Sequence, residues 1–167
     1  MRWRLPAAAG ALLLVTLALT GWLWADRGVG AGLREHAREI LTRHDAAGRT
    51  AQPPSSGRYL TGTLVESATT AEGSTRLTVE FTGDAPGNGP CERDYYAEAF
   101  ESASAVVVVL EGKPRNLLER LNLGFGEETC LLVGQRRTAT VVLTRPLHGR
   151  TVLDGHTAEP VAVVVSG

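Results

Sequence analysis

The stretch AVVVVLEG, residues 105–112, places four consecutive valines and a leucine in an apolar run that ends at Glu111. A short run of β-branched residues closed by a glycine is typical of a β-strand. Unbroken valine leaves no polar side for water, so we predict a central strand covered on both faces. Just upstream, RDYYAEAFES (93–102) is predicted to be a strand that turns back at Ser102–Ser104, with its acidic residues facing solvent.

Strand-like segments lie on both sides of this hairpin. The other predicted strands are RYLTGTLVES (58–67), RLTVEFT (76–82), RRTATVVLTRPL (136–147), TVLDG (151–155) and PVAVVVSG (160–167). The first two are predicted to be joined through ATTAEGS (68–74), and PRNLLERLNLGFGEE (114–128) is predicted to form a short helical insertion. The protein is therefore expected to be mainly β: a small antiparallel β-sandwich or open barrel of about six to eight strands.

Residues 1–26 predict an uncleaved signal anchor, a single transmembrane helix. The uncharged run Leu5–Ala25 spans about 31 Å at 1.5 Å per residue, close to a hydrocarbon thickness of about 30 Å. The basic and indole side chains that flank it are Arg2, Trp3, Arg4, Trp22 and Trp24. The positive-inside rule puts the N-terminus in the cytoplasm and the C-terminal domain outside the cytoplasmic membrane. The alternative is a protein secreted after cleavage of a signal peptide, although Trp24 suits a cleavage site poorly.

Residues 27–57 are predicted to be a juxtamembrane segment. Apolar residues recur at helical spacing on one face, namely Leu33, Ala37, Ile40, Leu41 and His44. This short helix is expected to pack on the folded domain, on a second copy of the chain or on the lipid surface. TAQPPSSG (50–57) has the composition of a linker, and residues 58–167 are expected to form the exported β-domain.

The sequence contains only two cysteines, Cys91 and Cys130. An even pair in an exported domain favours a disulfide, which would stabilise the fold by roughly 3–4 kcal/mol in the chain-entropy model. The alternatives are two buried thiols or a redox-active pair. No C-x-x-C motif supports the redox alternative.

The charge balance excludes one class of partner. The formal net charge is −1, and no segment is basic enough for a nucleic-acid interface. Residues 58–167 carry 10 basic and 14 acidic side chains, a net charge of 10 − 14 = −4. This acidity argues against direct attraction to anionic phospholipid head groups.

The histidines and carboxylates offer weak candidates for chemistry. LHGRTVLDGH brings His148, Asp154 and His156 into one stretch, but its eight-residue histidine spacing matches no familiar metal site. The acidic cluster in 92–101 could supply paired carboxylates, although exposed strand faces are normally charged. No G-x-S-x-G nucleophile motif is present. We therefore predict no catalytic, cofactor or metal residue.

The loop TGDAPGNGPCERD (82–94) carries oxygen donors among glycines and prolines. The possible calcium ligands are Asp84, Asn88, Glu92 and Asp94. Because the EF-hand pattern is missing, a turn-rich connection between strands is preferred over a calcium site.

The C-terminal third, CLLVGQRRTATVVLTRPLHGRTVLDGHTAEPVAVV (130–164), resembles exported or membrane-anchored actinobacterial proteins of unknown function. The shared order is a valine-rich strand, a Cys-containing loop, a T-A-T-V-x-L strand, a P-L-x-x-R-x-x-x-D turn and a final P-V strand. The likeness covers roughly residues 94–165. It implies an exported β-domain and assigns no functional residue.

From these features we expect a membrane-anchored extracytoplasmic domain that acts as a binding or scaffolding component of the cell envelope. Its partner would be another envelope protein or a second copy of the chain. One alternative is an envelope hydrolase that uses the 92–101 cluster or the His148/Asp154/His156 stretch. The other is a small-ligand-binding module with a pocket between the sheets.

Overall fold

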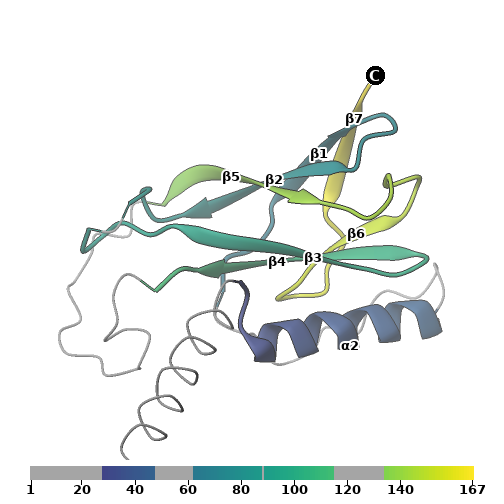
Figure 1. The fold of residues 1–167 in the computed structure, drawn as a ribbon, viewed down its shortest axis with the longest axis horizontal. Helices are drawn as coiled ribbons and strands as arrows, with labels where there is room; N and C mark the ends of the chain where they lie inside the picture. Colours follow the sequence, from purple (N-terminus) through teal and green to yellow (C-terminus); the bar gives the residue numbers. More distant parts are fainter. Residues whose placement is uncertain (1–27, 48–61, 88, 115–133) are drawn as a thin grey trace, which may run out of the picture.

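The computed structural model describes residues 28–47, 62–87, 89–114 and 134–167. The elements are α2 (Ala31–Ala47), β1 (Ser67–Ala71), β2 (Arg76–Gly83), β3 (Tyr95–Glu101), β4 (Ala105–Gly112), β5 (Gln135–Val142), β6 (Thr151–Asp154) and β7 (Ala162–Ser166). The strands form a four-stranded sheet in the order β5-β2-β1-β7 and a three-stranded sheet in the order β3-β4-β6 (Figure 1).

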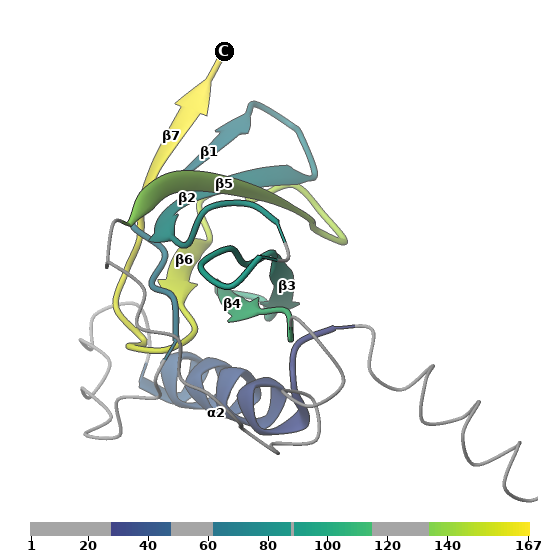
Figure 2. The ribbon, with the colours of Figure 1, turned by 90° about the vertical axis from the view of Figure 1, so that its left-hand side faces the viewer.

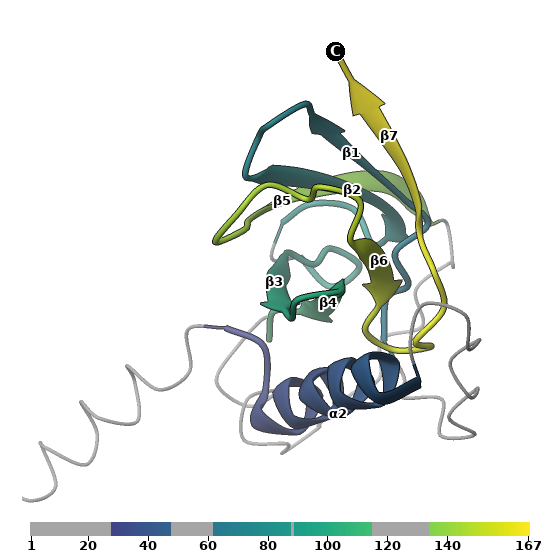
Figure 3. The ribbon, with the colours of Figure 1, turned by 90° about the vertical axis from the view of Figure 1, so that its right-hand side faces the viewer.

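The domain has three layers. Figures 2 and 3 show the four-stranded sheet on one side, the three-stranded sheet in the middle and α2 on the other side. One apolar core lies between the sheets, and a second lies between the three-stranded sheet and α2. The predicted sandwich is therefore confirmed, with a helix added as a third layer.

Strand β4 belongs to both cores, as its valine run predicts. Because side chains alternate along a strand, Val106, Val108 and Leu110 pack between the sheets. The intervening Val107 and Val109 pack against α2. All of them are fully buried, and each buried side chain of this size contributes about 1.5–3 kcal/mol.

The helix α2 confirms the predicted amphipathic pattern. Its buried residues are Ala37, Ile40, Leu41 and His44. The partner of this face is the folded domain, mainly β4 and β3, rather than a second copy or a lipid surface. The helix begins after Gly30, whose N–H donates a hydrogen bond to the carboxylate of Glu111 on β4. This contact satisfies a backbone donor that the helix itself leaves unpaired.

The sheets are mixed, so the prediction of an antiparallel sandwich is wrong in two pairs. β1–β2, β2–β5 and β3–β4 are antiparallel, but β1–β7 and β4–β6 are parallel. After β5 the chain crosses to the other sheet to form β6, and it then crosses back to form β7. Each crossing places the new strand parallel to its neighbour, β6 beside β4 and β7 beside β1. The apolar periodicity of a strand does not indicate the direction in which it pairs.

The first predicted strand is displaced. β1 occupies Ser67–Ala71, most of which was predicted to be a connection, and residues 62–66 precede it without strand structure. Ala68 and Thr70 are buried in alternation with exposed neighbours, but such small side chains give little apolar signal. The turn therefore shrinks to the residues around Gly73, whose φ of 69° suits glycine.

The remaining strand predictions inside the described ranges are confirmed. β6 and β7 lie within the predicted segments, while β2 and β5 each extend one residue beyond theirs, to Gly83 and Gln135. Ser102 closes the β3–β4 turn by donating its N–H to the Ala105 carbonyl at 2.9 Å. The predicted helical insertion lies outside the described residues, as does the linker 50–57. The signal anchor with Arg2, Trp3, Arg4, Trp22 and Trp24 also lies outside them. Among the residues that the structure does describe, no helix is long and apolar enough to cross a bilayer.

Candidate functional site

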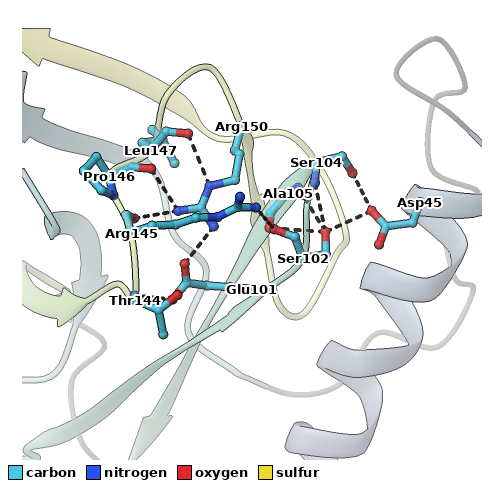
Figure 4. A network of polar contacts seen from close by, with 10 residues as sticks. All are labelled: Asp45, Glu101, Ser102, Ser104, Ala105, Thr144, Arg145, Pro146, Leu147 and Arg150. Atoms are coloured by element: carbon cyan, nitrogen blue, oxygen red, sulfur yellow. Dashed lines mark hydrogen bonds and ion pairs between the residues drawn. The ribbon is translucent and has the colours of Figure 1, made fainter. Parts of the chain in front are cut away.

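A buried arginine organises one end of the domain. Arg150, 6 % exposed, donates to Glu101 Oε2 at 2.7 Å and to three backbone carbonyls of the 144–150 loop (Figure 4). These carbonyls belong to Leu147, Arg145 and Pro146, at 3.2, 2.7 and 3.2 Å. The ion pair therefore fastens the loop before β6 to the end of β3. We call Arg150 and Glu101 the clamp.

The carboxylate of Glu101 is also bound by the backbone N–H of Thr144 at 2.6 Å. Burial alone would raise the pKa of Glu101, but the hydrogen bonds from Thr144 and Arg150, with the charge of Arg150, lower it below 4.5. The prediction that the acidic residues of 93–102 face solvent is therefore wrong for Glu101. Glu98 is likewise half-buried and lies 3.2 Å from Arg34 of α2.

The network continues from the clamp to the helix. Ser102 and Ser104, in the β3–β4 turn, both donate hydrogen bonds to Asp45 near the end of α2 (Figure 4). Arg145 donates to the Ser102 carbonyl at 2.8 Å. These contacts join the loop before β6, the β3–β4 turn and α2, so the network holds the layers together.

The stretch His148/Asp154/His156 does not converge on a site. His148 is exposed on a turn with φ of 42°, whereas Asp154 and His156 are buried. Asp154 accepts four hydrogen bonds, from the N–H groups of Val65, His156 and Thr157 and from the Thr157 hydroxyl. This carboxylate therefore shapes the turn after β6 and ties it to the segment before β1.

The loop between β2 and β3 is held by ion pairs and turn contacts. Asp84 lies 3.6 Å from Arg93, Asp94 lies 3.9 Å from Arg137, and Glu92 accepts the Gly89 N–H at 3.1 Å. Asn88 lies outside the described residues. Within the described ranges, no group of three His, Cys, Asp or Glu side chains is placed to hold a metal ion.

The predicted disulfide involves one described residue. Cys91 lies in the β2–β3 loop, while Cys130 lies outside the described residues. The described part of the chain contains no free cysteine. The Cys91–Cys130 link stays a prediction.

A polar cleft of about 400 Å³ opens where β4 ends and the β6–β7 connection begins. Its walls are Leu33, Gly62, Thr63, Asp84, Arg93, Tyr95, Leu110, Glu111, Gly112 and His156. We call this set the β4-end cleft. It draws residues from α2, β3, β4 and three connecting segments, which lie far apart in the sequence.

His156 is the most constrained side chain of the β4-end cleft. It is 2 % exposed, and its Nε2 lies 2.9 Å from the Leu110 carbonyl oxygen. Its Nδ1 is buried and finds no hydrogen-bond partner in the described part of the protein. Such a group costs about 1–3 kcal/mol when it stays unsatisfied, so a buried nitrogen of this kind calls for a partner.

Gly62 covers this ring. A Cβ built on Gly62 would lie 1.8 Å from His156 Cε1, so only glycine fits at this position. Sequence reasoning missed Gly62, Tyr95, Arg93 and Glu111 as members of one cleft. The one indication in the sequence was Glu111, a charged residue that directly follows the buried apolar run 105–110 of β4.

Comparison of the chain with protein-family models, curated proteins and solved structures gave no match. The candidate site therefore rests on the geometry of the chain itself.

Proposed function

We propose that the protein is a membrane-held, extracytoplasmic domain that binds or scaffolds other components of the cell envelope. The observation that carries this proposal is the attachment of α2. This helix begins only a few residues after the predicted anchor and is itself a layer of the β-domain. A domain joined in this way is displayed at the membrane in a restricted orientation.

The attachment starts before the helix does. Val29 is 2 % exposed in the core beneath the three-stranded sheet, and Gly30 is bound to Glu111. If the anchor ends at Ala25, three residues separate it from Val29. At about 3.5 Å per residue, these span roughly 10 Å, which keeps the domain close to the bilayer surface.

The partner in this proposal is a protein: another envelope component or a second copy of the chain. The net charge of −4 over residues 58–167 disfavours anionic head groups as the main binding surface. An acidic domain held at a membrane is better suited to a partner protein with basic surface groups.

A topology experiment tests whether the β-domain lies outside the cytoplasmic membrane. A reporter that is active only after export, fused behind Gly167, is expected to be active, and a reporter active only in the cytoplasm is expected to be silent. Activity of the cytoplasmic reporter would overturn the proposal.

Crosslinking in native membranes tests the binding role. The full chain is expected to be crosslinked to a defined protein, or to itself, and to keep that partner through purification. The control is the same chain with residues 1–26 replaced by a cleavable signal peptide, which should lose the membrane but keep the fold. Recovery of the anchored chain as an uncrosslinked monomer would contradict the proposal.

A small-ligand-binding module is the second candidate, and the β4-end cleft favours it. Its volume of about 400 Å³ falls within the range of small-molecule sites. The hydrolase alternative has no comparable observation behind it, because His148 lies apart from Asp154 and His156, and Glu101 is committed to Arg150.

A further inference from the structure

We propose that the β4-end cleft binds a primary ammonium group, held between the ring of His156 and the carboxylate of Glu111. This inference goes beyond display at the membrane and does not depend on it. Three observations carry it. Among the described residues, His156 Nδ1 has no hydrogen-bond partner and Glu111 has no cationic partner, and the cleft has a suitable size and walls.

His156 presents a hydrogen-bond acceptor. Its Nε2 lies 2.9 Å from the Leu110 carbonyl, and because a carbonyl only accepts, Nε2 carries the proton. In the neutral ring, Nδ1 then carries a lone pair. No donor among the described residues reaches this buried nitrogen. A ligand that satisfies it must bring an N–H or O–H group.

Glu111 contributes a carboxylate to the same cleft. It directly follows Leu110, whose carbonyl receives the His156 proton, and both residues line the cleft. The Gly30 N–H binds one of its carboxylate oxygens. No cationic side chain of the described ranges pairs with Glu111, so a cation is the ligand that this carboxylate favours.

The other walls select for an alkyl ammonium. Asp84 and Arg93 lie 3.6 Å apart and offset each other's charge. The net charge of the residues that line the cleft is therefore negative because of Glu111. Leu33 offers apolar surface for a short carbon chain. An ammonium has three N–H donors and no acceptor, which matches an imidazole nitrogen and a carboxylate.

Two neighbouring hollows extend the cleft. One of about 480 Å³ shares Leu33 and Glu111 with it, and adds the carboxylates of Glu35 and Glu39. Another of about 490 Å³ shares Gly62, Thr63, Asp84 and Tyr95. The ammonium can therefore belong to a free alkylamine or to a lysine-type side chain of a peptide that continues into these hollows.

Calorimetric titration of the full chain in detergent micelles tests the site. We expect n-pentylamine to bind, and n-pentanol, its neutral counterpart, to bind at least about tenfold more weakly. Glu111→Gln should weaken the binding of n-pentylamine by about tenfold or more. The matched control is Glu72→Gln, in the exposed β1–β2 turn, which should leave the affinity unchanged.

Because Glu111 also contacts the start of α2, a measurement on the unaltered chain is needed as well. Long-range ¹H–¹⁵N spectra of the labelled histidines are expected to show His156 with its proton on Nε2. Addition of n-pentylamine should shift the Nδ1 signal of His156 and leave that of the exposed His148 in place.

A tripeptide with a central lysine and alanine on both sides distinguishes the two sources. Tighter binding of the tripeptide than of n-pentylamine would support a peptide ligand, and weaker binding would support a free amine; either result supports the ammonium site. The proposal is overturned if neither probe binds, if Glu111→Gln binds n-pentylamine as tightly as the native chain, or if the His156 signal does not move.

Discussion

Arg150 and His156 are both buried polar side chains, yet their surroundings differ. Arg150 donates to a carboxylate and three carbonyls, and its partner Glu101 is bound from two sides. One ring nitrogen of His156 donates to a carbonyl, and the other has no hydrogen-bond partner in the described part of the chain. The comparison distinguishes a polar network that stabilises the fold from a buried side chain whose second nitrogen we propose as a ligand acceptor.

Removing the arginine of the clamp should have the largest effect. Arg150→Met leaves the carboxylate of Glu101 half-buried without its cation and leaves three loop carbonyls without their donor. Loss of one partner of a buried ion pair costs about 3–5 kcal/mol. Urea unfolding of the full chain in detergent should show this loss of free energy of unfolding.

The matched control is Arg145→Met, because Arg145 is exposed and, among the described residues, donates only to the Ser102 carbonyl. It should lower the free energy of unfolding by no more than about 1 kcal/mol. An equal loss of free energy of unfolding in the two variants would contradict the stabilising role of the clamp.

A methyl group at Gly62 should have the next largest effect. The Cβ of Gly62→Ala would overlap the ring of His156, so the ring or the backbone must move. Overpacking of this kind costs about 1–3 kcal/mol. The same variant should also weaken the binding of n-pentylamine, because displacement of the ring moves Nδ1 within the wall of the cleft.

Gly32→Ala is the control for this substitution. Gly32 lies in α2, and no atom of the described residues comes within 4 Å of the added Cβ. It should leave the free energy of unfolding unchanged or raise it by up to about 1 kcal/mol, the helix propensity of alanine over glycine. A loss of stability as large as that of Gly62→Ala would contradict the close approach to His156.

The smallest effect is a pH dependence that comes from the clamp. The folded state lowers the pKa of Glu101, so its stabilising contribution is present above the ordinary value of 4.5 and is lost as the pH falls through the folded pKa. The free energy of unfolding of Glu101→Gln should therefore decrease less on acidification than that of the native chain, by about 1 kcal/mol. Thermal unfolding followed from pH 6, above the ordinary value, down to pH 3 measures this difference. Parallel curves for the two chains would contradict the prediction.

Much of the local structure could be predicted from the sequence. The valine run identified β4 as a strand covered on both faces, and the alternation in 76–82 identified β2. The spacing of Ala37, Ile40 and Leu41 identified the buried face of α2. These predictions succeeded because apolar periodicity reports directly on which faces are covered.

The candidate site could not be predicted in the same way. His156 and Leu110 are 46 residues apart, and Glu101 and Arg150 are 49 apart, so nothing in the local pattern shows that they meet. The stretch His148/Asp154/His156 gave a misleading hint, because β6 separates the turn that holds His148 from the turn that holds His156.

The sequence by itself therefore determined most of the strands, the amphipathic helix and the two-sided burial of β4. Each of these depends on the spacing of apolar residues within one short segment. The tertiary structure alone decided the parallel pairs, the clamp and the cleft around His156. Each of these depends on how the chain crosses between the sheets, and a crossing leaves no periodic signal in the residues that it brings together.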